Sequence, residues 1–298
     1  MNLGYIGLGK MGFNMVLRLL EKGYEVFVFN RSEEPTRNIS KHGAKPTYSL
    51  QSLASAVAAP SLIWLMVPYQ AVDSVLGELT PFLNKGDTVI DGGNSPYKES
   101  MRRARELEEK GIEFLDVGVS GGPSGARNGA CIMVGGRKEN FMKFKNLFRD
   151  LSVRGGYAYM GKSGAGHFVK MVHNGIEYGM MEALAEGFAV MKASPFKLDL
   201  SKVAKLYNHG SVIESRLVSW LKKAFEQYGK ELNEISGSVS QSGEGSWTVE
   251  AAKEFGIPVP IIEGSLNFRI ESQKTPSYTG QIVSALRHQF GGHAVSKK

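Results

Sequence analysis

The chain has very little cysteine and no long apolar run. Its single cysteine, Cys131, excludes an intrachain disulfide and a metal site built from several thiolates. The apolar neighbours Ala130, Ile132 and Met133 predict that this thiol is buried. No apolar run approaches the ~18 residues of a membrane span, and a strand-like run begins almost directly after Met1, which leaves no room for a secretory leader. These absences predict a protein of a reducing, cytoplasmic compartment, with no membrane partner.

Positive charge is not concentrated in any one segment either. The net charge is +7, yet Lys and Arg are scattered along the chain and interleaved with Glu, as in residues 102–110. Such a stretch is typical of a solvated helix face. A mild positive field is suited to steering small anions into a cleft. We therefore expect no nucleic-acid partner and an anionic small-molecule substrate.

The 298 residues are enough for two domains. Short apolar runs alternate with helical patterns up to about residue 160, and the apolar runs lie at 3–6, 26–29, 62–67, 88–90, 114–117, 131–134 and 158–160. This alternation predicts a Rossmann-like, doubly wound and mainly parallel sheet. After Gly161 only helical spacing remains. We predict an α/β protein with a dinucleotide-binding domain over 1–162 and an all-helical substrate and dimerisation domain over 163–298.

A glycine-rich turn follows the first strand-like run directly and opens a helical pattern. Such glycines permit a tight turn, let the backbone approach a pyrophosphate and let the helix pack on the strand. The N–H groups at the start of the helix attract the phosphates. We predict that a dinucleotide is bound by this turn, which consists of Gly7, Leu8, Gly9, Lys10, Met11 and Gly12.

The second strand-like run ends at Asn30, Arg31 and Ser32, where an NAD enzyme usually carries an acidic residue for the ribose hydroxyls. Arg31 instead offers a guanidinium that can pair with a 2′-phosphate, and Ser32 adds a hydroxyl donor. These residues favour NADP, with NAD as a weaker alternative. A turn with a surface arginine is the other interpretation. We also assign to the cofactor site Val67, Pro68 and Asn94.

Four polar residues share one face of the long helical pattern that begins near residue 163. Lys170, His173, Asn174 and Glu177 are related by steps of three, four and seven residues. The rest of the helix is apolar or small, so the stripe needs a polar neighbour, which a substrate cleft against the first domain would supply. The alternative is a solvated stripe with Lys170–Asn174 and His173–Glu177 contacts.

Several motifs resemble those of 6-phosphogluconate dehydrogenases. They lie at 7–12, at 90–95, at 116–122 with 125–126 and 135–136, at 169–179 and, in the tail, at 286–293. Residues 169–179 read VKMVHNGIEYG and resemble the family's signature. The chain length resembles the family's short bacterial form. The resemblance implies oxidative decarboxylation of 6-phosphogluconate to ribulose 5-phosphate in gluconate utilization and the pentose phosphate pathway, with no metal.

Residue by residue, the resemblance implies that Lys170 is the general base and Glu177 the general acid. It assigns the sugar acid to Asn94, Ser120, Gly121, Gly122, His173 and Asn174. These residue types suit the chemistry, because a buried lysine favours the neutral amine that can take a hydroxyl proton. Once protonated, the lysine can hydrogen-bond the new carbonyl oxygen as carbon dioxide leaves. A carboxylic acid can then protonate the enediol carbon.

The resemblance implies that the 5-phosphate end of the substrate is bound by Tyr178, Arg269, Arg287 and His293. Arginine is the natural bidentate partner of a phosphate. In the long-chain pattern a further loop contributes lysine and threonine, whereas this chain has Ser242 and Glu244 there. A carboxylate beside a phosphate is unfavourable. Either Glu244 points away or the substrate is a different one.

Two other functions remain open from the sequence. One is another β-hydroxyacid dehydrogenase, such as the 3-hydroxyisobutyrate type, which has no need of Glu177 and whose helix typically carries an asparagine in place of His173. The other is a non-catalytic NADP-binding sensor, in which the stripe is structural. The resemblance also implies a homodimer or homotetramer in which the tail of one subunit completes the site of its neighbour.

Overall fold

The computed structural model describes residues 1–293. The chain forms two compact units, Met1–Met171 and Val172–Lys298, which are joined within helix α9 (Ala165–Ala193). The division therefore lies downstream of residue 162, because the first turns of α9 pack against the sheet of the first unit. None of the helices among residues 1–293 combines the length and the apolar character needed to cross a bilayer.

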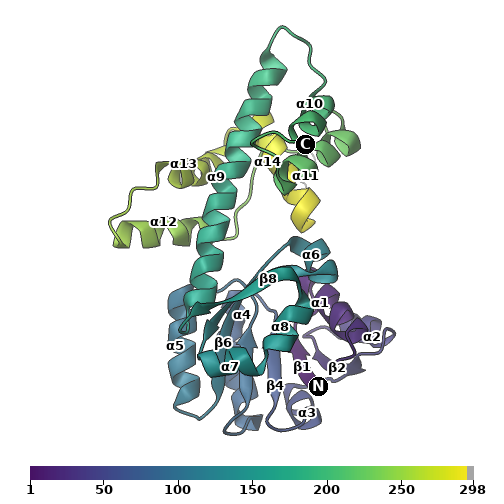
Figure 1. The fold of residues 1–298 in the computed structure, drawn as a ribbon, viewed down its shortest axis with the longest axis vertical. Helices are drawn as coiled ribbons and strands as arrows, with labels where there is room; N and C mark the ends of the chain where they lie inside the picture. The colour runs from purple at the N-terminus through teal and green to yellow at the C-terminus, as the bar shows by residue number, and fades with distance from the viewer. Residues whose placement is uncertain (294–298) are drawn as a thin grey trace. The chain divides into compact units, whose positions relative to one another are not determined.

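The first unit contains an eight-stranded sheet with the order β3-β2-β1-β4-β5-β6-β7-β8 (Figure 1). Within the described residues the neighbouring strands run parallel, apart from the antiparallel pair β6–β7. The strands are β1 (Asn2–Ile6), β2 (Glu25–Phe29), β3 (Lys45–Pro46), β4 (Leu62–Leu65), β5 (Thr88–Asp91), β6 (Glu113–Ser120), β7 (Ala130–Gly136) and β8 (Ser152–Gly161). The predicted mainly parallel sheet is confirmed.

Helices follow most of these strands and cover both faces of the sheet. They are α1 (Lys10–Glu21), α2 (Glu33–Ser40), α3 (Leu50–Ala56), α4 (Tyr69–Leu79), the 3₁₀ turn η1 (Thr80–Phe82), α5 (Tyr97–Glu108), α6 (Gly122–Asn128), α7 (Lys138–Lys143) and α8 (Lys145–Leu151). The apolar run of β4 shows why both faces of the sheet need to be covered. Leu62 and Trp64 belong to one core cluster, whereas Ile63 and Leu65 belong to another. Since side chains alternate along a strand, a sheet buried on both faces needs a continuous apolar run.

The order of the strands reverses between β1 and β4. From β1 the chain proceeds to β2 and β3 on one side, and from β4 to β5 and β6 on the other. In open parallel sheets a ligand binds outside the carboxyl ends of the strands at such a reversal. The glycine turn after β1 lies at this point.

The second unit is built from helices, as predicted. It comprises most of α9 together with α10 (Leu200–Tyr207), α11 (Arg216–Tyr228), α12 (Glu244–Glu254), α13 (Pro260–Ser272) and α14 (Tyr278–Gly291). Its core joins Phe188 of α9 to Leu221 and Phe225 of α11 and Leu286 of α14. In Figure 1, α12 and α13 lie on one side of α9, and α10 and α11 lie on the other.

Side-chain caps start three of these helices. Asp199 accepts hydrogen bonds from the backbone at the start of α10, Ser215 does so for α11, and Ser277 for α14. Each cap satisfies an N–H group that has no partner inside the helix. The helix starts are therefore encoded locally.

The Cys131 thiol is exposed, so the predicted burial is wrong. Cys131 is the second residue of β7, opposite Ser120 at the end of β6. Its neighbours Ala130 and Ile132 are in the core. Because successive side chains of a strand point to opposite faces, buried neighbours do not imply a buried cysteine.

Candidate active site

The glycine turn after β1 is closed so tightly that two of its glycines cannot be replaced. Gly7 has a φ of +99°, and a Cβ there would lie 2.3 Å from the Met66 carbonyl oxygen. A Cβ on Gly12 would lie 2.0 Å from the Gly7 oxygen. A Cβ on Gly9, by contrast, would meet nothing within 4 Å. Protein packing does not demand a glycine at position 9, whereas the close approach of a pyrophosphate does.

Asn30 ties the end of β2 to this turn. Its Oδ1 accepts a hydrogen bond of 2.9 Å from the Leu8 N–H, and its Nδ2 donates to the Ser32 oxygen at 3.0 Å. Arg31 and Ser32 are exposed beside it. Asn30 therefore shapes the turn, while Arg31 lies at the carboxyl end of β2, where the 2′-phosphate of NADP would need a cation.

The loops after β1, β4 and β5 meet at the same edge of the sheet. A Cβ on Gly7 would lie 2.9 Å from Val67 Cγ1, and a Cβ on Gly93 would lie 2.7 Å from the Val67 oxygen. Pro68 follows Val67 at the start of α4, and Asn94 follows Gly93. The structure thus gathers the predicted cofactor residues of three loops around Val67.

A buried arginine supports the loop that carries Asn94. Arg103 is 2% exposed, and its Nη1 donates to Ser95 Oγ at 3.2 Å. Ser95 Oγ in turn donates to Asp91 Oδ2 at 2.7 Å, and Arg103 Nε donates to Asp73 Oδ1 at 2.8 Å. The solvated helix face predicted over 102–110 is wrong at Arg103. Its helical spacing with the buried Ser100 and Leu107 is the signal that could have revealed it.

The loop after β6 carries Ser120, Gly121 and Gly122. Ser120 is the last residue of the strand, and the φ angles of Gly121 and Gly122 are +135° and +62°. This left-handed backbone favours glycine. The three residues therefore form a turn at the carboxyl edge of the sheet, as expected of a ligand-binding loop.

Lys170 lies against the same strand. It is 7% exposed, and a Cβ on Gly118 would lie 2.4 Å from the Lys170 Cβ. Gly118 is thus a position at which α9 approaches β6 closely. The missing side chain makes room for the lysine stem two residues before Ser120.

Asp116 fixes the start of α9. Its Oδ1 accepts from the Gly164 N–H at 2.7 Å, and its Oδ2 accepts from the His167 N–H at 2.9 Å. The His167 ring is buried, and its Nδ1 lies 2.7 Å from Ser100 Oγ. Sequence reasoning missed these contacts because they join residues about 50 or more positions apart. These contacts fix the start of α9 and thereby the position of Lys170 along β6.

Replacement of Gly118 by alanine should move Lys170. Because the added Cβ has no room, we expect a loss of about 1–3 kcal/mol in the free energy of unfolding. Urea unfolding at 25 °C measures this loss. The matched control is Gly77→Ala in α4, where a Cβ meets nothing within 4 Å and alanine should gain about 0.5–1 kcal/mol. Equal stabilities of the two variants would contradict the close approach.

The polar stripe of α9 continues beyond Lys170. His173 Nδ1 lies 3.0 Å from Asn174 Oδ1 and 3.7 Å from Glu177 Oε2. Asn174 is buried like Lys170, while the His173 and Glu177 side chains are 35% and 23% exposed. A fully solvated stripe does not describe this face. The four side chains are thus buried or partly buried on this face, and the substrate cleft that would meet them stays a prediction.

Tyr178 and Arg269 lie face to face at the end of the stripe. The guanidinium carbon is 3.3 Å from the centroid of the tyrosine ring, and Arg269 is 1% exposed. Its Nη2 contacts Met181 Sδ at 3.8 Å, but among the described residues its Nε, its Nη1 and the Tyr178 hydroxyl have no hydrogen-bond partner. Burial lowers the pKa of Arg269 to about 10. Buried donors without partners indicate a site for an anion.

Arg287 belongs to the same cluster. It is 7% exposed, and its Nη1 donates to Ser240 Oγ at 2.7 Å. Burial lowers its pKa, and the nearby charges of Glu244 and Glu177 oppose this effect. His293 is instead exposed at the end of α14, with its ring edge-on to Phe290.

Glu244 is buried at the first position of α12 rather than directed into solvent, and Ser242 is exposed. The next residue, Gly245, lies on Tyr178, since a Cβ there would be 2.6 Å from the ring. The interaction of Glu244 with Arg287 supplies a counter-charge inside the cluster. Glu244 therefore does not point away from the arginines, and the other alternative left by the sequence, a different substrate, stays open until it is tested.

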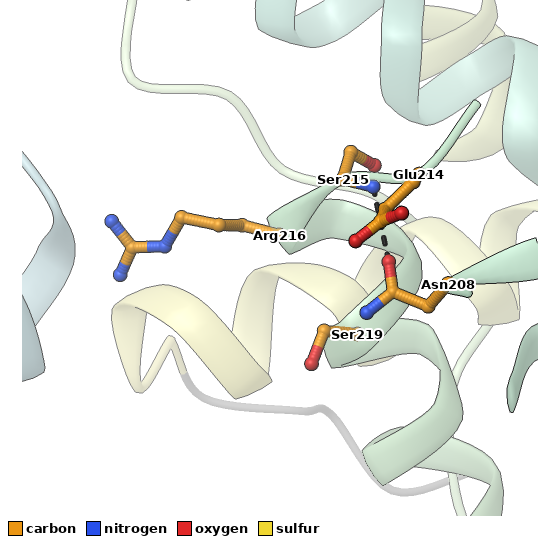
Figure 2. A pocket seen from close by; sticks show the side chains of 5 residues that line it. All are labelled: Asn208, Glu214, Ser215, Arg216 and Ser219. Carbon is orange, nitrogen blue, oxygen red and sulfur yellow. Dashed lines mark hydrogen bonds between the residues drawn. The ribbon is translucent and has the colours of Figure 1, made fainter. Parts of the chain in front are cut away.

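A separate hollow of about 640 Å³ opens at the start of α11 (Figure 2). It is lined by Asn208, Glu214, Ser215, Arg216 and Ser219. Glu214 accepts from the Gly210 N–H and Asn208 from the Ser215 N–H, so these side chains close the local turn. Figure 2 shows Arg216 extended away from the other four. The lining contains no predicted site residue.

Comparison with known proteins agrees with this geometry. The chain matches the family model of the NAD binding domain of 6-phosphogluconate dehydrogenase over residues 2–161, and that of the 6-phosphogluconate dehydrogenase C-terminal domain over residues 166–279. A parallel sheet with a dinucleotide-binding turn, followed by a helical unit, defines the class of two-domain nicotinamide-nucleotide dehydrogenases. Within that class, the chain belongs to the 6-phosphogluconate dehydrogenase family.

Individual relatives differ in length, and only some of them carry a cofactor in their names. The chain is 46% identical to YqeC of Bacillus subtilis (strain 168), whose naming as a 6-phosphogluconate dehydrogenase is itself provisional, over 100% of both chains. It is 42% identical to an NAD(+)-dependent, decarboxylating 6-phosphogluconate dehydrogenase of Haloferax volcanii, over 100% of this chain and 99% of that one. The Ovis aries enzyme is 38% identical over 88% of this chain, which spans 57% of that enzyme.

Solved structures show the same fold. The 6-phosphogluconate dehydrogenase of Plasmodium falciparum, described in complexes with NADP+ and with 6-phosphogluconate, has a TM-score of 0.83 and 30% identity. That match covers 96% of this chain and 70% of the other. A 3-hydroxyisobutyrate dehydrogenase of Mycobacterium tuberculosis has a TM-score of 0.75 at 18% identity, covering 94% of this chain and 97% of the other. The latter likeness shows the fold alone.

Proposed function

We propose that the protein oxidises and decarboxylates 6-phosphogluconate to ribulose 5-phosphate with NADP as the preferred cofactor and NAD as a weaker one. The observation that carries the proposal is the buried Arg269, whose Nε and Nη1 have no hydrogen-bond partner among the described residues. A phosphate ester supplies acceptor oxygens for buried donors of this kind. An unphosphorylated 3-hydroxy acid, the substrate class of the rival dehydrogenases, would leave them unpaired at a cost.

The chemistry is assigned to two residues that lie seven positions apart on one face of α9. Bound NADP supplies the acceptor for the hydride of substrate carbon 3. Lys170, neutral at that moment, takes the proton of the carbon 3 hydroxyl, and a β-keto acid results. The protonated Lys170 then donates a hydrogen bond to the new carbonyl oxygen as the bond to the carboxylate breaks and carbon dioxide leaves. Glu177 finally gives its proton to the enediol carbon.

The remaining residues position the substrate. We assign the phosphate to Tyr178, Arg269 and Arg287, with His293 as a further contact. The sugar acid is assigned to Asn94, Ser120, Gly121, Gly122, His173 and Asn174. Because α9 rises about 1.5 Å per residue, the stripe from Lys170 to Tyr178 extends about 12 Å. This length is comparable with that of an extended phosphorylated six-carbon sugar acid.

Initial rates of cofactor reduction test the proposed function. We expect rapid NADPH formation with 6-phosphogluconate, equimolar release of carbon dioxide, and slower reduction of NAD. Gluconate, which lacks only the phosphate, is the matched control and should be turned over poorly. Turnover of 3-hydroxyisobutyrate without carbon dioxide, and none of 6-phosphogluconate, would make the rival function correct.

We further propose that the active protein is a homodimer or homotetramer. Its helical unit exposes the apolar side chains of Ile176 and Met180 on α9, together with Ile257 and Ile261 near the start of α13. Ile261 lies on Gly179 of α9, so these side chains share one region of the surface. Exposed apolar patches of this kind mark subunit interfaces. Gel filtration with light scattering should show an oligomer, and a fully active monomer would contradict this expectation.

A further inference from the structure

A buried carboxylate beside the arginine cluster has no part in the proposed chemistry. Glu182 lies on α9, one turn beyond Tyr178, and is 6% exposed. Among the described residues neither of its oxygens has a hydrogen-bond partner. Two charged groups act on it, Arg269 from α13, which attracts it, and Glu186 from its own helix, which repels it. Carboxylates are almost never buried in this way without a partner.

The carboxylates around the two arginines make the binding of a further anion electrostatically costly. Arg269 interacts with Tyr178, Arg287, Glu177 and Glu182, and Arg287 interacts with Glu177 and Glu244. Two cations thus face three carboxylates. A bound phosphate adds at least one more negative charge to a buried cluster, where charge repulsion is weakly screened. The loss of one carboxylate charge would relieve this repulsion.

We propose that Glu182 is the proton-linked counter-charge of Arg269, ionised when the anion site is empty and protonated when the substrate phosphate occupies it. The inference rests on the proposed function, since it takes Arg269 as the phosphate ligand. Burial raises the pKa of Glu182 to about 7, and repulsion by Glu186 adds to the effect. The proton is therefore taken up near neutral pH. Glu182 makes phosphate affinity depend on pH without contacting the phosphate itself.

The expected size of the effect follows from the fraction of protein in the protonated state. With a pKa of about 7, that fraction at pH 8.5 is about one thirtieth. If only the protonated state binds phosphate well, the apparent dissociation constant rises in proportion, by about 30-fold. The phosphate ester loses its own second proton near pH 6, which would strengthen binding as the pH rises. A weakening above pH 7 therefore points to the protein.

The test compares the wild type with Glu182→Gln, which keeps the shape and removes the charge. Between pH 6 and pH 8.5 the KM for 6-phosphogluconate should rise by up to about 30-fold in the wild type and stay level or fall in Glu182→Gln, while kcat profiles coincide. Glu186→Gln, at an exposed position one turn away, removes the repulsion that adds to the raised pKa of Glu182, so its rise in KM should remain but begin at a lower pH. The same rise in Glu182→Gln would overturn the inference.

Calorimetry with inorganic phosphate as the probe separates this inference from the proposed function. Titrations at pH 8.5 in buffers of different ionisation enthalpy should show uptake of about one proton by the wild type and none by Glu182→Gln. That result supports the proton link even if 6-phosphogluconate is not turned over. Turnover with normal kinetics but no proton uptake would leave the proposed function standing and refute the role of Glu182.

Thermal unfolding reports the ionisation of Glu182 without any ligand. The folded-state pKa of Glu182 is about 7, against an ordinary value of 4.5. Because the folded value is raised, the unfolded state loses its proton first, and the wild type loses stability as pH rises from about 4.5 to 7. Glu182→Gln should therefore match the wild type in Tm near pH 4.5 and exceed it at pH 8.5. A lower Tm of Glu182→Gln at pH 8.5 would mean that the ionised Glu182 stabilises the protein, which would contradict the inference.

Discussion

Replacement of Lys170 by methionine should abolish substrate oxidation while NADP binding remains unchanged. The amine is proposed both to take the hydroxyl proton and to hold the carbonyl oxygen as carbon dioxide leaves. General base catalysis alone contributes about 10²–10⁴-fold, so we expect kcat to fall by at least about 10³-fold. Methionine preserves an unbranched stem against Gly118, where a Cβ would lie 2.4 Å from the Lys170 Cβ. Fold and cofactor turn should therefore survive.

Two measurements separate a catalytic effect from a structural one. Initial rates give kcat, and fluorescence titration gives the dissociation constant of NADPH. Lys162→Met makes the same change at an exposed position shortly before α9, and its kcat should equal that of the wild type. Retained turnover in Lys170→Met would remove this residue from the mechanism, and loss of NADPH binding would show that the variant is misfolded.

Replacement of Arg31 by alanine should weaken NADP far more than NAD. Arg31 is exposed at the carboxyl end of β2, next to the Asn30 that holds the glycine turn. A hydrogen bond to a charged group contributes about 1.5–3 kcal/mol. Since about 1.4 kcal/mol corresponds to a factor of ten, the dissociation constant of NADP should rise by about 10- to 100-fold. That of NAD, which lacks the 2′-phosphate, should change little.

The control for Arg31 is a second exposed arginine close by. Arg37 in α2 pairs with Glu33 at 2.6 Å and is 68% exposed, so Arg37→Ala should leave both dissociation constants unchanged. Titration of each variant with both oxidised cofactors gives the comparison. Equal increases in the dissociation constants of NADP and NAD in Arg31→Ala would mean that Arg31 does not bind the 2′-phosphate. Other residues would then determine the cofactor preference.

The strands were predictable because a sheet buried on both faces requires continuous apolar runs. Leu62 to Leu65 form such a run and lie at the centre of the sheet as β4. The exception is β3, whose two residues Lys45 and Pro46 are exposed and pair only with β2. A charged residue and a proline are typical of an edge strand and carry no apolar pattern. Sequence reasoning therefore missed it.

The candidate site was predictable only in part. The glycine turn and the polar face of α9 depend on residues within one or two turns of each other, and their spacing alone predicts them. Arg103, Asp116 and His167 were missed, because their partners lie in other elements of the fold. Their segments look like an ordinary charged helix, a strand and the start of a helix. Only the folded chain shows that they hold Asn94 and Lys170 in place.

The sequence by itself determined the succession of strands and helices, the conformation of the glycine turn and the common face of Lys170 and Glu177. These features depend on local backbone sterics and on the periodicity of apolar residues. Tertiary structure alone decided that Cys131 is exposed, that Glu244 is buried with Arg287, and that Glu182 lies near Arg269. Burial and charge depend on which distant side chains pack against a residue, and no spacing within a helix or strand contains that information.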